Sequence, residues 1–158
     1  MVTDRLAKRM KPLSGVPQGE LLIHEIYASI QGESSFAGLL CTFVRTTTCN
    51  LRCSYCDSPH AFTQGESMTE DAIVEEVERL GVRLVEITGG EPLLQPGVYP
   101  LMTRLSNAGY TVLLETSGSL DISKVDERVV KIVDFKTPSS GEVDQNYYEN
   151  IEKISDRD

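Results

Sequence analysis

Short apolar runs alternate along this chain with stretches in which apolar residues recur at every third or fourth position. The runs are rich in β-branched residues and predict strands at 21–30, 39–45, 84–88, 111–115 and 129–135. The helical spacing predicts helices that include residues 73–80 and 101–108. Strands and helices in this alternation are typical of an α/β fold built on a parallel sheet.

The first of these helices has recognisable ends. Thr69 can cap its first turn, in which Glu70 and Asp71 complement the helix dipole. Gly81 provides a stop signal at the other end. The apolar residues between these ends lie on one helical face: Ile73, Val74, Val77 and Leu80. We therefore expect this helix to pack on the sheet.

The rest of the chain carries weaker patterns. Residues 1–20 are polar, contain several prolines and glycines, and predict a loose lead-in. Residues 21–158 predict one domain, since a chain of 158 residues has the length of a single core. A helical pattern near the end predicts a last helix around Tyr147, Tyr148, Ile151 and Ile154.

Composition and charge narrow the class of protein. The net charge is −9, with 24 acidic and 15 basic residues, and such a negative field disfavours nucleic-acid binding. No run of about 18 apolar residues predicts a membrane span. The segment Met1 to Lys11 is basic but is not followed by the apolar stretch of a secretory signal. We therefore expect a cytoplasmic protein with no membrane and no nucleic-acid partner.

Three of the four cysteines lie within eight residues, as Cys49, Cys53 and Cys56 in a C-x3-C-x2-C pattern. Clustered cysteines in a reducing compartment indicate metal ligands rather than disulfides. Three thiolates can hold a 4Fe-4S cluster and leave one iron open. The alternative is structural zinc, with His60 or Cys41 as the fourth ligand.

The remaining cysteine and the two histidines receive other interpretations. Cys41 lies inside a predicted strand, where a buried thiol behaves as a small apolar side chain. His24 and His60 have no histidine partner at ligand spacing, and neither is assigned a catalytic role.

The cysteine pattern followed by Gly89-Gly90-Glu91-Pro92 after a strand resembles the radical SAM superfamily, whose members use S-adenosylmethionine (SAM). This resemblance implies a 4Fe-4S cluster and SAM as cofactors. It also implies a partial, incomplete parallel β/α barrel. Parallel α/β sheets place their ligand sites at the carboxyl ends of the strands, where these motifs lie.

A closer resemblance, over about residues 22–150, is to the 7-carboxy-7-deazaguanine synthase family. It rests on four segments: EIYASIQGE at 25–33, FVR at 43–45, CDS at 56–58 and DFKTPSSG at 134–141. It implies a radical SAM lyase that converts 6-carboxy-5,6,7,8-tetrahydropterin to 7-carboxy-7-deazaguanine with loss of ammonia, in queuosine and 7-deazapurine biosynthesis. It further implies Mg²⁺, a homodimer and a reducing electron donor such as flavodoxin.

Matching this family position by position implies the residues of the site. The residues that would bind the pterin are Ile30, Gln31, Gly32, Glu33, Arg45 and Thr88. Those that would bind SAM are Tyr55, Gly90, Glu91, Ser117 and Lys136. Ser58 would bind Mg²⁺ where the family usually has Thr, since a serine hydroxyl supplies the same hard oxygen. Beyond the cluster and SAM, no side chain is expected to be catalytic.

The length of the chain and the cysteine pattern leave other interpretations open. Members of this family usually continue past the position of Asp158 with another strand and a tail over the substrate, so the resemblance predicts either a fragment whose C-terminal part is missing or an unusually short version. A glycyl-radical-enzyme activase would share the cysteine pattern, although IQGE and DFKTPSSG together are not expected in one. A non-catalytic zinc or iron–sulfur module is the third interpretation.

Overall fold

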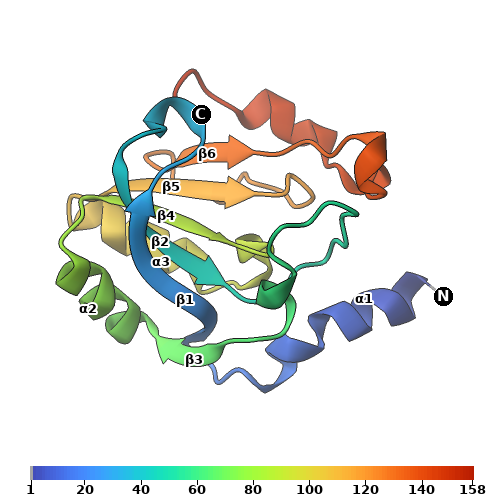
Figure 1. Cartoon of the computed structure of the whole chain (residues 1–158), viewed down its shortest axis with the longest axis horizontal. Helices are drawn as coiled ribbons and strands as arrows, with labels where there is room; N and C mark the ends of the chain where they lie inside the picture. Colours follow the sequence, from blue (N-terminus) through green and yellow to red (C-terminus); the bar gives the residue numbers. More distant parts are fainter. Residues whose placement is uncertain (1) are drawn as a thin grey trace.

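A six-stranded mixed sheet with the order β3-β1-β2-β4-β5-β6 organises this computed structural model, which describes residues 2–158 (Figure 1). The strands are β1 Glu20–Ile30, β2 Leu40–Thr46, β3 Glu66–Thr69, β4 Leu84–Gly89, β5 Thr111–Thr116 and β6 Val130–Val133. The helices are α1 Val2–Met10, α2 Glu70–Leu80 and α3 Val98–Asn107. Strands β2, β4, β5 and β6 are parallel, while β1 runs antiparallel to both β2 and β3. The α/β class is confirmed, and the parallel prediction holds for four of the six strands.

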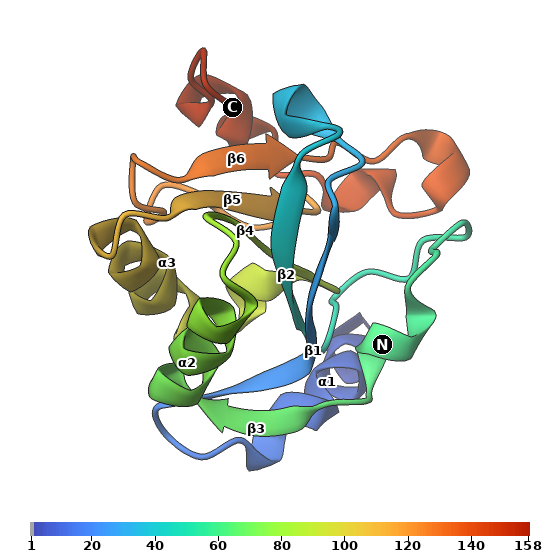
Figure 2. The same ribbon diagram turned by 60° about the vertical axis from the view of Figure 1, so that its left-hand side comes forward.

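The period-2 alternation of β2, β4 and β5 divides their side chains between two apolar clusters. Figures 1 and 2 place α2 and α3 on the same side of the sheet, where they cover the larger cluster. Val44, Val85 and Ile87 of the sheet contribute to it together with Leu101 of α3. Cys41 belongs to the smaller cluster on the opposite face, which confirms that it is a core residue.

The ends of α2 follow the sequence signals. The hydroxyl of Thr69 accepts a hydrogen bond from the backbone N–H of Ala72, and Gly81 closes the helix at φ 70°. That left-handed conformation suits glycine because it has no Cβ atom. Local chemistry therefore fixes where α2 begins and ends.

Several expectations were wrong. Within the described part of the predicted lead-in, 2–10 form α1 and 11–15 a 3-10 helix; Met1 lies outside the described residues. The guanidinium of Arg9 pairs with Glu142 at 3.1 Å, a contact that sequence patterns do not reveal. The last pattern forms a 3-10 helix, 148–153, rather than an α-helix, and β6 is shorter than predicted. β3 was missed because its four residues gain strand structure by pairing with the first half of β1.

The parallel strands bring their carboxyl ends to one edge of the sheet. The segment between β2 and β3 contains the cysteine motif, and the residues after β4, β5 and β6 lie at the same edge (Figure 1). Within residues 2–158, no helix combines the length and the apolar character that crossing a membrane requires.

Candidate functional site

A cleft of about 540 Å³ opens at the carboxyl ends of β2, β4 and β5. It brings together thirteen of the site residues predicted from the sequence: Gln31, Gly32, Glu33, Arg45, Cys49, Cys53, Tyr55, Cys56, Ser58, Thr88, Gly90, Ser117 and Lys136. Two predicted residues do not line it: Ile30, which is 60% exposed at the end of β1, and Glu91, which is completely buried.

Hydrogen bonds connect the cysteine loop to the segment that follows β6. The backbone N–H of Arg52 donates to the carboxylate of Glu142 at 2.7 Å. The backbone N–H of Ser54 donates to the carbonyl of Ser140 at 2.9 Å. The guanidinium of Arg52 also donates to the carbonyl of Cys49 at 2.8 Å. The loop is therefore ordered by the protein itself.

The donor set fits an open iron–sulfur cluster better than a closed zinc site. Cys49, Cys53 and Cys56 are free thiols in one cleft, and the described lining contains no histidine and no fourth cysteine. Of the fourth ligands considered for zinc, Cys41 is in the opposite core cluster and His60 lies outside the lining. Burial raises the pKa of Cys49 to about 11 and raises that of Cys53.

Gly90 makes the close approach of β4 to the cysteine loop possible. A Cβ atom at this position would lie 2.6 Å from Cβ of Cys49 and would collide with the carbonyl of Thr48. The next backbone N–H, that of Glu91, donates to the same Thr48 carbonyl at 2.9 Å. The glycine is therefore required by packing, in addition to the SAM contact that the sequence predicts.

The carboxylate of Glu91 joins the end of β4 to the end of β5. It accepts hydrogen bonds from the backbone N–H of Leu93 at 3.0 Å and of Ser117 at 2.9 Å, and from the hydroxyls of Thr116 and Ser117. Burial raises its pKa, and these hydrogen bonds oppose the rise. Its contact with SAM stays a prediction, whereas its contact with Ser117 positions a residue of the cleft.

Glu86 is a residue of the cleft that the sequence analysis missed. It is 2% exposed in the middle of β4, and its carboxylate accepts a hydrogen bond from the side chain of Gln31. Burial, and next the charge of Glu115, raise the pKa of Glu86 to about 8. The available signal was a single acidic residue inside the apolar run 84–88.

Glu33 and Glu115 line the cleft together with Glu86, and we call these three carboxyl groups the acidic wall. The carboxylate of Glu115 accepts a hydrogen bond from the hydroxyl of Thr88 at 2.7 Å. The charge of Glu115 is the largest cause of the raised pKa of Glu33, followed by burial. Repulsion among like charges that share a site favours proton retention. The wall therefore shifts Glu33 and Glu86 towards the protonated form, in which a carboxyl group can donate a hydrogen bond to a ligand.

Cationic groups stand around the acidic wall. Nε of Arg45 donates to Glu25 at 2.8 Å, and Nη2 donates to the hydroxyl of Tyr27 at 3.0 Å. Burial acts to lower the pKa of Arg45, but these hydrogen bonds outweigh it and the pKa is raised. Lys136 forms an ion pair with Asp134 and has a raised pKa for the same balance of causes.

The mouth of the cleft carries the predicted magnesium residue. The hydroxyl of Ser58 donates to the carboxylate of Asp57 at 2.8 Å, so two hard oxygens lie side by side. Tyr55, between the second and third cysteines, is 53% exposed and lines the cleft.

The two histidines are brought together, although the sequence analysis treated each as isolated. The ring centroids of His24 and His60 lie 4.9 Å apart, outside the cleft lining. Their proximity depends on the pairing of β1 with the rest of the sheet, which sequence spacing does not encode.

Comparisons with known proteins match the family that the sequence resembles. The family model described as "Radical SAM superfamily" matches residues 43–137. The 7-carboxy-7-deazaguanine synthase of Koribacter versatilis is 52% identical over 138 residues, covering 86% of this chain and 61% of that protein. The protein of the same name from Chlorobaculum tepidum is 47% identical over 134 residues, covering 85% and 61%.

The chain thus spans about three fifths of the length of these relatives. A solved structure, the crystal structure of QueE from Escherichia coli, is similar with a TM-score of 0.72 at 22% sequence identity. The match covers 85% of this chain and 68% of that one, and it supports the fold predicted from the sequence.

Proposed function

The chain belongs to the radical SAM superfamily, as its cysteine motif predicts, and on that premise we propose that it acts as a 7-carboxy-7-deazaguanine synthase. The proposed reaction is the ring contraction of 6-carboxy-5,6,7,8-tetrahydropterin with loss of ammonia. One observation carries the proposal: the three cysteines and five of the six residues predicted to bind the pterin line the same cleft, Ile30 being the exception. The names of the similar proteins favour this reaction over that of a glycyl-radical-enzyme activase.

The cofactors are proposed to occupy the side of the cleft that carries the cysteine loop. The thiolates of Cys49, Cys53 and Cys56 would hold a 4Fe-4S cluster, and Tyr55, Gly90, Ser117 and Lys136 would contact SAM. When bound, the cluster and SAM supply the one-electron chemistry that removes a hydrogen atom from the substrate. The protein orients the reactants and excludes water, which is the usual contribution of the chain in a cofactor enzyme.

The pterin is proposed to lie against the acidic wall. The carboxylate of Glu115 can accept hydrogen bonds from ring N–H and amino groups, while Glu86, whose raised pKa favours the protonated form, can donate one. Arg45 suits the substrate carboxylate, because a guanidinium binds a carboxylate through two parallel hydrogen bonds. In that event Arg45 would keep Glu25 as a partner outside the cleft.

Mg²⁺ is proposed to bind beside the substrate carboxylate. The hydroxyl of Ser58 and the carboxylate of Asp57 are neighbouring oxygen donors, which suit a small hard cation. The cation would offset the charge that the substrate brings into an already acidic cleft.

The remaining features are predictions of the sequence that we carry forward. They are a single domain over residues 21–158, a homodimer, a reducing donor such as flavodoxin, and a cytoplasmic location. The single domain is supported by the sheet, in which β1 to β6 share one continuous order.

The proposal is tested by an anaerobic assay of reconstituted protein with SAM, dithionite, Mg²⁺ and 6-carboxytetrahydropterin. We expect 7-carboxy-7-deazaguanine as the product. Deoxyadenosine without this product would contradict the proposed substrate for this chain and leave the radical SAM assignment in place. A colourless protein that forms neither would contradict the cluster assignment.

A pair of cysteine variants provides the matched control. Cys53→Ala removes a proposed cluster ligand, and we expect it to lose the brown colour and the cleavage of SAM. Cys41→Ala removes a thiol from the opposite core and should retain both. If Cys53→Ala still cleaves SAM, the assignment of the cluster ligands is wrong.

A further inference from the structure

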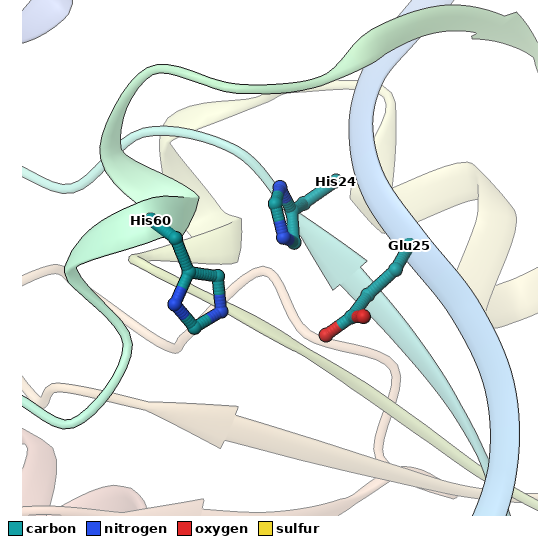
Figure 3. A group of neighbouring side chains, drawn as sticks. All are labelled: His24, Glu25 and His60. Carbon is teal, nitrogen blue, oxygen red and sulfur yellow. The ribbon is translucent and has the colours of Figure 1, made fainter.

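His24, Glu25 and His60 form a group of possible metal ligands outside the cysteine cleft (Figure 3). One ligand atom from each residue can be chosen so that all three lie within 4.8 Å of one another. His24 and Glu25 come from β1, and His60 comes from the 3-10 turn Pro59–Phe62 that follows the cysteine loop. Segments from two parts of the chain thus meet at one point.

A β-bulge explains how the side chains of two consecutive residues of one strand can both contribute to the same group of ligands. Neighbouring side chains of a regular strand point to opposite faces. The register of β1 against β2 shifts between Ile23 and Glu25, with His24 as the inserted residue. Bulges re-aim side chains in this way and are frequent near functional sites.

The hydrogen bonding of His24 prepares its other ring nitrogen for a metal ion. Nδ1 lies 2.8 Å from the carbonyl oxygen of Gln64, and a carbonyl can only accept, so Nδ1 carries the proton. In the neutral ring, Nε2 then has an available lone pair. Histidines that bind metals typically donate their second N–H to a carbonyl or carboxylate, as His24 does.

The Gln64 carbonyl is itself held in place. It accepts a second hydrogen bond from the hydroxyl of Thr47 at 2.6 Å. The next residue, Gly65, passes so close to β1 that a Cβ atom would lie 2.8 Å from the carbonyl oxygen of Ile23. The orientation of the His24 ring is therefore fixed by packed backbone.

His60 combines an anchored backbone with a movable side chain. Its neighbour Ala61 is buried, and the Ala61 carbonyl accepts a hydrogen bond from the backbone N–H of Thr48 at 2.8 Å. The His60 ring is exposed, tilted by 44° to the ring of His24. Ligand atoms around a zinc ion lie about 3.4 Å apart. Rotation of the exposed His60 and Glu25 side chains can close the remaining distance.

Charge at the site favours a cation. One oxygen of Glu25, Oε1, accepts the hydrogen bond from Nε of Arg45, and its second oxygen can serve as a metal ligand. The adjoining hollow of about 500 Å³ is also lined by Glu66 and Glu76, and it leaves room for water ligands. Two imidazoles and one carboxylate suit zinc and related transition metals rather than Mg²⁺.

We propose that His24, His60 and Glu25 bind one divalent transition-metal ion of the zinc class, with water completing its coordination. The bound ion links β1 to the turn that begins three residues after Cys56. It therefore stabilises the end of the cysteine loop from outside the cleft. It also binds Glu25, whose carboxylate accepts a hydrogen bond from Arg45.

The test is a titration of the cluster-loaded protein with Zn²⁺ against a chromophoric chelator, under conditions in which the cysteine sulfurs are already occupied. We expect one equivalent of Zn²⁺ to bind without loss of iron. His24→Gln and His60→Gln should each weaken this binding by at least about tenfold, as the loss of a ligand does. Glu66→Gln is the matched control, because it changes a carboxylate of the same hollow that is not a proposed ligand.

Two outcomes would overturn the proposal: binding of equal affinity in the histidine variants, or weakening by Glu66→Gln as large as by His60→Gln. A second measurement uses the fact that the chain contains two histidines. In a variant that combines Cys49→Ser, Cys53→Ser and Cys56→Ser, Zn²⁺ should shift the imidazole nitrogen NMR signals of both histidines. A shift of one ring alone would contradict a shared ion, and activity plays no part in either readout.

Discussion

Two buried glutamates of the same segment show how partners, rather than burial, determine what a carboxylate does. Glu91 is 0% exposed and Glu86 is 2% exposed. Glu91 accepts hydrogen bonds from two backbone N–H groups and two hydroxyls, and so connects the ends of β4 and β5. Glu86 accepts from Gln31, and its burial, followed by the charge of Glu115, raises its pKa and helps to keep it protonated. The first carboxylate holds the scaffold, and the second can exchange a proton with a ligand.

The largest expected effect on stability is that of a substitution at Gly90, the residue next to Glu91. In Gly90→Ala the added methyl group would overlap the Thr48 carbonyl and Cys49, so the cysteine loop must move. We expect a loss of about 2 kcal/mol or more in the free energy of unfolding, together with a reduced iron content after reconstitution. Chemical denaturation and iron analysis measure the two effects.

Gly32→Ala is the control for this substitution. Gly32 lines the same cleft, but a Cβ atom there would meet nothing within 4 Å. Stability and iron content should therefore stay close to those of the wild type. An equal loss in both variants would show that the cleft, rather than the approach of β4 to the cysteine loop, is sensitive to added volume.

The next effect tests Glu91 directly. Glu91→Gln keeps the shape of the side chain but places an amide donor where donors already converge, so a buried N–H loses its acceptor. We expect a loss of about 1–3 kcal/mol in the free energy of unfolding. Equilibrium unfolding in urea measures it, and an unchanged midpoint would contradict the role of Glu91 as a structural link.

The smallest expected effect is that of Glu86→Gln at pH 5. The difference in the free energy of unfolding between this variant and the wild type should grow as the pH rises. The folded protein retains a proton on Glu86 that the unfolded chain releases above its usual pKa of 4.5. The wild type therefore loses stability as pH rises from about 4.5 to about 8, and the variant lacks this contribution. Unfolding curves at several pH values should show the variant gaining relative to the wild type.

The exposed Glu75→Gln is the matched control for that pH series, because Glu75 lies on the solvent side of α2. Its stability should follow the wild type at every pH. If Glu86→Gln also follows the wild type, Glu86 is ionised in the folded protein, and the contrast with Glu91 fails.

Local signals predicted those parts of the molecule in which short-range chemistry decides the structure. The cap at Thr69 and the stop at Gly81 are readable because each acts on its immediate neighbours. The resemblance to a family then placed most of the cleft residues. The resemblance implied these residues one by one, and they meet in one cleft because strand ends in a parallel sheet share one edge.

The parts that were missed depend on contacts between distant segments. β3 is a strand because β1 offers it an edge, and His24 meets His60 because of a bulge in β1. Glu86 is a single acidic residue within an apolar run, and its raised pKa depends on burial and on the charge of Glu115 from the neighbouring strand. In each case the deciding neighbour lies far away in sequence.

The contacts that hold the cysteine loop also have a consequence for the order of folding. The bond from Arg52 to Glu142 joins residues 90 positions apart, and the hydroxyl of Ser54 reaches the carbonyl of Ser139 across 85. Contacts of such separation form late, since the intervening chain must first lose its freedom. Zinc fingers, by contrast, fold around their metal. In this chain the sheet must assemble before the cysteine loop acquires its shape, so the cofactor is received by a nearly finished protein.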